Sequence, residues 1–162
     1  MAKGVNKKLF KNAIISFILL SIIVIGVSYY FVYKDALIGP VFILLGLINL
    51  AFLKFYKIKI ASVYPDMLFG FIDNGVLVIM AVLGGSIAGV AGAIIGGAAG
   101  NTITDGLGGL FEGHAAERLR GQKILEERTA LSSTLGKMAG CLFGAGIGLI
   151  LVWAISLVWA GI

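Results

Sequence analysis

The sequence predicts an all-α integral membrane protein with five transmembrane helices and a cytosolic N-terminus. Hydrophobic residues make up 59% of the 162-residue chain and charged residues only 13%, which is typical of a membrane domain. Five apolar runs each approach the length of about 20 residues that crosses roughly 30 Å of hydrocarbon. Arranged as five crossings, these runs leave twelve of the thirteen Lys and Arg residues on the cytosolic side.

The predicted spans follow one another with short connections, except before the last. Lysines precede the first span as they would precede a signal peptide, but the apolar run is too long and no small-residue cleavage site follows it. We therefore expect a permanent helix there. In chain order the spans are Ala13 to Tyr33, Ala36 to Leu53, Asp66 to Leu83, Ser86 to Asp105 and Met138 to Trp159.

Basic and aromatic residues orient the spans. Tyrosines end the first span and tryptophans the last, as in the aromatic belt at a membrane interface; they are Tyr29, Tyr30, Tyr33, Trp153 and Trp159. Lys34 is the single basic residue expected outside. Those expected inside are Lys3, Lys7, Lys8, Lys11, Lys54, Lys57, Lys59, Arg118, Arg120, Lys123, Arg128 and Lys137.

The third and fourth spans are predicted to form a hairpin. Asp73-Asn74-Gly75 is also a turn signal, and residues 76–104 could be drawn as one long tilted span. A single crossing there would place the basic segments 54–59 and 118–137 on opposite sides of the membrane. We therefore place the hairpin turn at Gly84-Gly85-Ser86.

Glycines recur at helical spacing in the third to fifth spans. Such rows let helix backbones approach closely, so these spans should form the packed centre. They also suggest a homodimer through glycine-lined faces. The rows are Gly136, Gly140, Gly144 and Gly148; Gly85, Gly89, Ala93 and Gly97; and Gly92, Gly96 and Gly100.

The chain divides into two predicted parts. Residues 1–62 form an N-terminal two-helix membrane segment, and residues 63–162 a three-helix transport core. The core includes a cytosolic amphipathic connector at 113–135, where charged residues alternate with Ala and Leu. Polar residues inside the spans are predicted to hydrogen-bond between helices; they are Ser16, Ser21, Asn49 and Ser156.

The apolar stretch between Lys59 and Arg118 contains no Lys or Arg, and it holds the carboxylates Asp66, Asp73, Asp105 and Glu112. An ionised side chain near the bilayer centre costs roughly 2.5–3.5 kcal/mol on insertion scales, so unpaired carboxylates there usually mark ion or proton pathways. This imbalance points to a cation as the missing partner. For two of these carboxylates a purely structural role is the alternative. Asp66 and Glu112 would then sit at the headgroup boundary, with Asp66 capping the start of its helix after Pro65.

A hairpin folded about Gly85 places Asp73 opposite residues 97–101 and Asp66 level with Asp105. Asn101, Asp105 and Glu112 then share one helix face. The predicted path has Asp66 and Glu112 toward the cytosol. Its inner end is lined by Asp73, Asn74, Asn101, Thr104 and Asp105.

Every candidate ligand is an oxygen, which favours a hard cation such as Ca²⁺, Na⁺, Mg²⁺ or Mn²⁺ over Zn²⁺ or Cu⁺. Asp73 and Asp105 would neutralise one Ca²⁺ or two Na⁺ equally well. This balance predicts exchange at one shared site, with protons as further competitors. No cofactor is expected, and Ca²⁺ and Na⁺ would bind as transported ions.

The strings Phe69-Gly70-Phe71-Ile72-Asp73-Asn74 and Gly100-Asn101-Thr102-Ile103-Thr104-Asp105, followed by Gly108-Gly109 and Glu112-Gly113, resemble the transmembrane protein 65 family. The resemblance covers about Val63 to Gly113 and leaves out the first two spans. It implies sodium-dependent calcium export carried by Asp73, Asn74, Asn101 and Asp105. Because an Arg- and Ser-rich presequence is lacking, we expect a prokaryotic plasma membrane rather than a mitochondrial one.

The hairpin is more distantly similar to the vacuolar iron transporter family, which places an Asp after Phe-Gly in one helix and another about thirty residues later. Where that family carries a metal-binding Met, this chain has Gly109. An iron- or manganese-type exporter is therefore an alternative to calcium exchange.

Several function classes are disfavoured. The single cysteine, Cys141, provides neither a disulfide framework nor a zinc site. No catalytic triad or phosphate-binding glycine loop is present, so we expect no enzymatic activity. The net charge of +5 is accounted for by basic residues beside apolar spans, so no nucleic-acid partner is expected. The competing hypothesis is a non-transporting membrane scaffold or assembly subunit.

Overall fold

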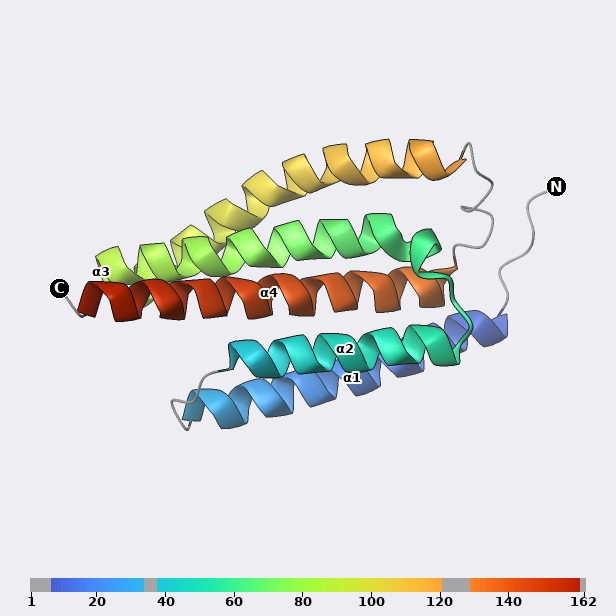
Figure 1. Ribbon diagram of the computed structural model, residues 1–162, viewed down its shortest axis with the longest axis horizontal. Helices are drawn as coiled ribbons and strands as arrows, with labels where there is room; N and C mark the ends of the chain where they lie inside the picture. Colours follow the sequence, from blue (N-terminus) through green and yellow to red (C-terminus); the bar gives the residue numbers. More distant parts are fainter. Residues whose placement is uncertain (1–6, 34–37, 121–128, 161–162) are drawn as a thin grey trace.

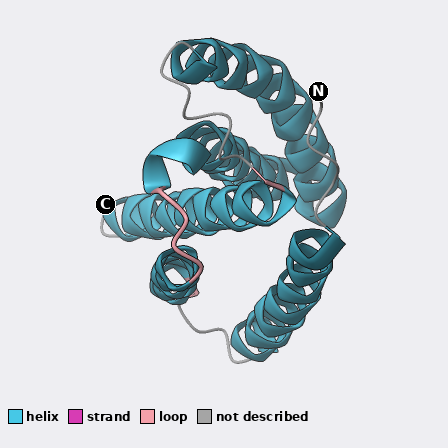
Figure 2. Ribbon diagram, turned by 90° about the vertical axis from the view of Figure 1, so that its right-hand side faces the viewer, coloured by secondary structure: helices cyan, strands magenta, loops and turns pink. Residues whose placement is uncertain are grey.

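The described residues form a bundle of long helices. A computed structural model describes residues 7–33, 38–120 and 129–160. These residues form α1 (Lys7–Tyr33), α2 (Gly39–Phe55), α3 (Ile60–Arg120) and α4 (Ala130–Ala160), shown in Figure 1. Viewed from one end, the described chain contains helices and short loops only (Figure 2). The predicted all-α class is confirmed.

Helix α3 is a hairpin. Its regular geometry is interrupted at Ala88 (φ −136°, ψ 24°) and Gly89 (φ 61°, ψ −142°), and the chain reverses there. We call residues 60–87 the first limb and residues 90–120 the second limb. The limbs run antiparallel and close together near the turn (Figure 1), where a Cβ atom on Gly92 would overlap the Gly84 carbonyl oxygen.

The hairpin was predicted, but its turn was placed too early, at Gly84-Gly85-Ser86. Gly84 lies inside a limb, where it is needed for close backbone approach rather than for reversal. Gly89 instead adopts a positive φ, with nothing within 4 Å of an added Cβ atom, and this is a conformation that only glycine takes without strain. Identical glycine spacing in the sequence did not distinguish these two uses.

Replacing Gly89 with Ala should therefore destabilise the protein through the backbone alone. We expect a loss of about 1–3 kcal/mol of unfolding free energy, the range for a residue held in a glycine-only region. Gly97→Ala is the matched control, since its added Cβ would make an ordinary 3.6 Å contact with Ala81 in regular helix. Unfolding in detergent compares the two; equal stability of both variants would contradict the assignment of the turn.

Helix α4 is the centre of the bundle and contacts α1, α2 and α3. Its glycine row packs along the first limb, and the two segments run parallel. Cβ atoms added at Gly136, Gly140, Gly144 and Gly148 would meet, in that order, Val63, Met67, Phe71 and Gly75. The predicted packed centre is confirmed. Because the row is covered within the chain, it does not support the predicted dimer.

Helix α2 packs on the other side of α4. The buried Asn49 donates its side-chain Nδ2–H to the Leu135 carbonyl oxygen at 3.1 Å, which confirms its predicted interhelical role. Gly46 allows the ring of Phe143 to approach to about 3.0 Å of an added Cβ. The prediction for Ser156 was wrong, because its hydroxyl donates to the Trp153 carbonyl in its own helix.

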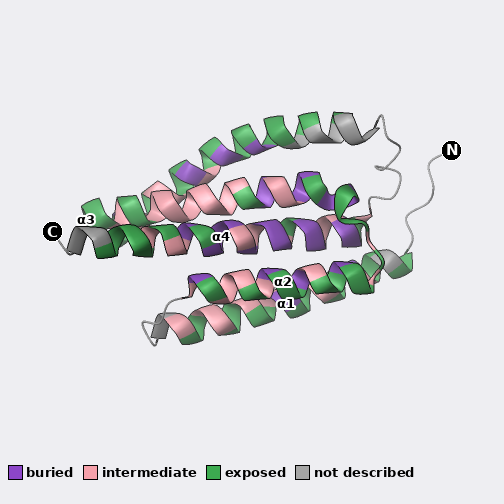
Figure 3. Cartoon of the chain, viewed as in Figure 1, coloured by how far each residue is buried: buried purple, intermediate pink, exposed green. Residues whose placement is uncertain are grey.

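Large apolar side chains cover much of the surface. Burial concentrates on α4 and on the sides of α2 and the first limb that face it, whereas much of α1 and of the second limb is exposed (Figure 3). Exposed side chains include Ile25, Val90 and Leu110, at 68%, 79% and 72% of full exposure. Such an apolar surface fits burial in lipid rather than in water.

Among the helices that the structure describes, three are long and apolar enough to cross a membrane. The stretches are Phe10–Phe31 in α1, Ile60–Phe111 along both limbs of α3, and Ala130–Leu157 in α4. Helix α2 is apolar but shorter, Gly39–Phe55. Length and composition thus fit the predicted integral membrane protein.

Helix bounds differ from the prediction at both ends of the third span. Helix α3 begins at Ile60, so Pro65 lies in its second turn and Asp66 is not an N-terminal cap. The predicted domain boundary at residue 62 also falls inside this helix. Of the predicted connector 113–135, the part up to Arg120 continues α3 and the part from Ala130 belongs to α4. Residues 121–128 lie outside the described residues.

Candidate cation site

A hydrogen bond between opposed polar side chains joins the two limbs. Thr104 in the second limb donates its hydroxyl to Asp73 Oδ1 in the first limb at 2.8 Å. Thr104 is 1% exposed. At about 1.5 Å per residue, Asp73 lies about 20 Å along the first limb from Ile60, far from either helix end. A carboxylate therefore sits midway along an apolar hairpin.

The Thr104 hydroxyl has alternative acceptors in its own helix. The carbonyl oxygens of Gly100 and Asn101 lie 2.9 and 3.1 Å from its Oγ1. A hydroxyl has one proton but two acceptor lone pairs. If a cation bound at Asp73, Thr104 could turn its proton to a carbonyl and offer its oxygen to the ion.

This geometry gives a matched test with two substitutions at one position. Thr104→Val keeps the shape but removes the hydroxyl, and it should weaken cation binding about tenfold, near the 1.5 kcal/mol expected for a hydrogen bond to a charged group. Thr104→Ser keeps the hydroxyl and should retain most of the affinity. Titration calorimetry with Ca²⁺ and with Na⁺ measures both; equal affinities would exclude the Thr104 oxygen from the site.

A second polar pair flanks Thr104 on the second limb. The side-chain amide of Asn101 donates to Asp105 Oδ2 at 3.1 Å. Asp105 is exposed, whereas Thr104 faces the first limb. Asp105 was predicted to share the central site with Asp73 directly. The later position of the hairpin turn instead places Thr104 opposite Asp73. Asp105 is left at the edge of the contact between the two limbs, which we call the seam.

Asp66 does not join this pair. Its side chain is 2% exposed, and the hydroxyl of Ser133 in α4 donates to Asp66 Oδ1 at 2.7 Å. It lies two turns nearer the Ile60 end than Asp73 and is not level with Asp105, contrary to the prediction. Asp66 therefore belongs to the contact between the first limb and α4.

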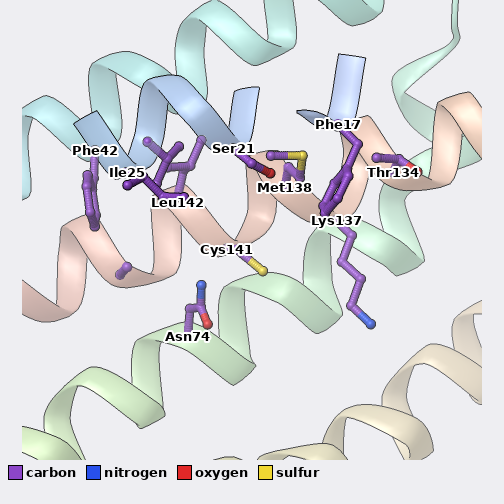
Figure 4. Close-up of a pocket in the computed structure, with 12 residues that line it drawn as sticks. Phe17, Ser21, Ile25, Phe42, Asn74, Thr134, Lys137, Met138, Cys141 and Leu142 are labelled. Carbon is purple, nitrogen blue, oxygen red and sulfur yellow. The ribbon is translucent and has the colours of Figure 1, made fainter. Parts of the chain in front are cut away.

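Asn74 and Glu112 complete the predicted ligand set. Asn74 lines a cavity of about 550 Å³ between α1, α2 and α4, on the side of Cys141 (Figure 4). Adjacent helical residues point about 100° apart, so Asn74 is turned from the Asp73–Thr104 contact. Glu112 lies in the helical second limb, and its side chain is outside the described residues.

The structure adds a basic residue that the sequence places on the cytosolic side, just before the last predicted span. Lys137 lies two turns inside α4, and its ammonium nitrogen is 3.7 Å from the centroid of the Phe69 ring. One turn on, Cys141 lies against Gly70 of the first limb, where an added Cβ atom would meet the Cys141 Sγ at 3.0 Å. The glycine row beginning at Gly136 was a signal that Lys137 stands within the helix.

Comparison of the chain with protein families, with curated proteins and with solved structures finds no match. The resemblance to the transmembrane protein 65 family therefore stays a prediction. The function is inferred below from the contacts of this chain alone.

The assembled seam is poor in charged ligands. Within the described ranges, no three His, Cys, Asp or Glu side chains come together as a metal-binding group. The groups that do converge are the Asp73 carboxylate and the Thr104 hydroxyl, with Asn101 and Asp105 at the edge. A cation held here would take one or two carboxylates and otherwise neutral oxygens or water. That set suits Na⁺ or Ca²⁺ better than a soft metal.

Proposed function

We propose that this protein is a secondary cation transporter that exchanges Na⁺ or H⁺ for Ca²⁺ at the seam between the two limbs of α3. The observation that carries the proposal is the Thr104–Asp73 hydrogen bond, because it places a carboxylate and a switchable hydroxyl together in an apolar hairpin. A carboxylate at such depth is costly unless it works on a cation.

The proposal includes five membrane crossings with the N-terminus in the cytosol. Helices α1 and α2, the two limbs and α4 would each cross once. One end of the bundle carries described lysines, Lys7 and Lys8 at the start of α1 and Lys54 at the end of α2. The opposite end carries exposed Tyr29 and Tyr30. Lysine inside and aromatic residues at the far interface support this orientation.

The charge of the seam supports exchange of unlike ions. Asp73 and Asp105 together match one Ca²⁺. With the Lys137 ammonium counted, the same seam carries a single negative charge, which one Na⁺ or one proton balances. Whether Ca²⁺ or a monovalent cation binds would then depend on whether the Lys137 ammonium lies close to the two carboxylates.

The limb contact supplies a candidate moving element. Near the turn the limbs touch through glycines, and a Cβ atom on Gly96 would overlap the Met80 carbonyl oxygen. Farther along, the second limb splays away from the first (Figure 1). Rocking of the second limb about the Gly89 turn would open the Asp73–Thr104 contact to one side of the membrane, as alternating access requires.

Ca²⁺ uptake into proteoliposomes tests the proposal. An outward Na⁺ gradient should drive uptake, and dissipating the gradient should stop it. Ca²⁺ flux that persists without a coupling Na⁺ or H⁺ gradient would indicate a channel. Mn²⁺ or Fe²⁺ uptake in place of Ca²⁺ would support the divalent-metal exporter.

A membrane scaffold is the second candidate. The observation favouring it is that Asp73, Asp105 and Asp66 each accept a hydrogen bond from another side chain of the chain, as structural carboxylates do. Absence of flux under Na⁺, H⁺ and voltage drive, in protein that elutes as a single folded species, would favour the scaffold.

A further inference from the structure

Lys137 is a cation placed where the proposed transporter handles cations. It lies within the apolar stretch Ala130–Leu157, and its ammonium rests on the face of the Phe69 ring at 3.7 Å. Lysine in an apolar span is rare and marks a pathway or an ion pair. An aromatic face is a weaker partner for an ammonium than a carboxylate is, so this resting place is one that Lys137 can leave.

The Phe69 ring lies between two levels of carboxylate. It follows Asp66 by three residues and precedes Asp73 by four, so all three share one face of the first limb. Along α4, Ser133 binds Asp66 one turn before Lys137, and Cys141, one turn after it, packs against Gly70, three residues before Asp73. The four-carbon stem of lysine is flexible. It can carry the ammonium about one helical turn, roughly 6 Å, along the first limb from Phe69 toward Asp73.

We propose that Lys137 is a tethered competitor for the transported cation: it rests on Phe69 when a cation occupies Asp73, and moves onto the Asp73 carboxylate when the cation leaves. This inference rests on the proposed function, because it concerns the same site. The empty carrier would then change conformation with Asp73 paired instead of exposed as a lone charge in an apolar medium. Cation entry and Lys137 release become one event.

The proposal predicts opposite effects from two substitutions. Lys137→Met removes the competitor and should tighten Ca²⁺ binding at least about tenfold, which corresponds to about 1.4 kcal/mol. Phe69→Leu removes the resting place and should weaken binding several-fold, since the ammonium then spends more time on Asp73. The double variant should bind Ca²⁺ as Lys137→Met does, because the ring acts on cation binding through the lysine.

Matched controls isolate the effect. Lys54→Met removes an exposed lysine at the end of α2, and Phe71→Leu makes the same aromatic change on the exposed side of the first limb. Both should bind Ca²⁺ as the wild type does. Lys137→Gln repeats the charge removal with a polar side chain, in case Lys137→Met is poorly folded.

Equilibrium binding of Ca²⁺ to the purified variants in detergent decides the matter. If the wild type binds Ca²⁺ and neither Lys137→Met nor Lys137→Gln binds it more tightly, the tethered competitor is overturned. The proposed transporter is then unaffected. Binding that appears only when Lys137 is replaced supports the competitor strongly. No binding in any variant overturns both this inference and the proposed site.

Discussion

Asp73→Asn is expected to abolish Na⁺-driven Ca²⁺ uptake. The amide keeps the size of the side chain and can still bond Thr104, so the limbs should remain joined. What is lost is the charge. A unit charge pair at 4 Å is worth about 4 kcal/mol at an effective dielectric constant of about 20, which corresponds to a loss of about a thousandfold in affinity for a monovalent cation and more for Ca²⁺.

Two further substitutions make this result specific. Asp73→Glu keeps the charge and should retain measurable uptake. Asp105→Asn removes a carboxylate at the edge of the seam and should reduce uptake less than Asp73→Asn, because Asp105 is exposed and bonded to Asn101. Uptake by Asp73→Asn at the wild-type rate would remove Asp73 from the transport site.

Gly140→Ala should be strongly destabilising although it lies outside the site. An added Cβ would overlap the carbonyl oxygen of Met67, and backbone on both helices leaves no flexible side chain to yield. Helix α4 and the first limb would have to separate. Overpacking of this kind costs about 3 kcal/mol, and it would carry Lys137 away from Phe69, so cation binding should fall as well.

Gly109→Ala is the control for that prediction. Gly109 lies in the second limb with nothing within 4 Å of an added Cβ. In regular helix, alanine is favoured over glycine by up to about 1 kcal/mol, so this variant should be as stable as the wild type or slightly more so. Denaturation in mixed detergent micelles compares the pair. Equal stability of Gly140→Ala and Gly109→Ala would contradict the packing of α4 on the first limb.

The sequence was sufficient for the helical class, the hairpin and the glycine-packed centre. Each follows from a periodic or compositional signal that depends little on exact position: apolar runs predict helices, and the row Gly136 to Gly148 predicts close contact. The Asn49 hydrogen bond was likewise foreseeable, because a lone amide in an apolar helix needs a partner.

The site was predicted only in part, because ligand geometry depends on helix phase. The difference between a turn at Gly85 and one at Gly89 was enough to bring Thr104 instead of Asp105 opposite Asp73. Asn74, next to Asp73 in sequence, instead lines a cavity with residues of α1, α2 and α4. Neither outcome can be read from spacing when several glycines compete for the same turn.

Lys137 shows a different limit. No Lys or Arg lies in the sequence between Lys59 and Arg118. A basic residue from another part of the chain can nevertheless lie close to the carboxylates of this segment in the folded protein. Helix α4 brings its lysine over Phe69 from a part of the sequence that the count did not include. Because Lys137 directly follows Gly136, the first glycine of the row, it should have been predicted to lie within the helix that contains the row.

Competition between Ca²⁺ and Na⁺ for the purified protein tests the central claim most directly. Radioactive Ca²⁺ should bind saturably, Na⁺ should displace it competitively, and Asp73→Asn should bind neither ion. Saturable Ca²⁺ binding that Na⁺ does not affect, or that survives in Asp73→Asn, would contradict a single exchange site between the limbs of α3.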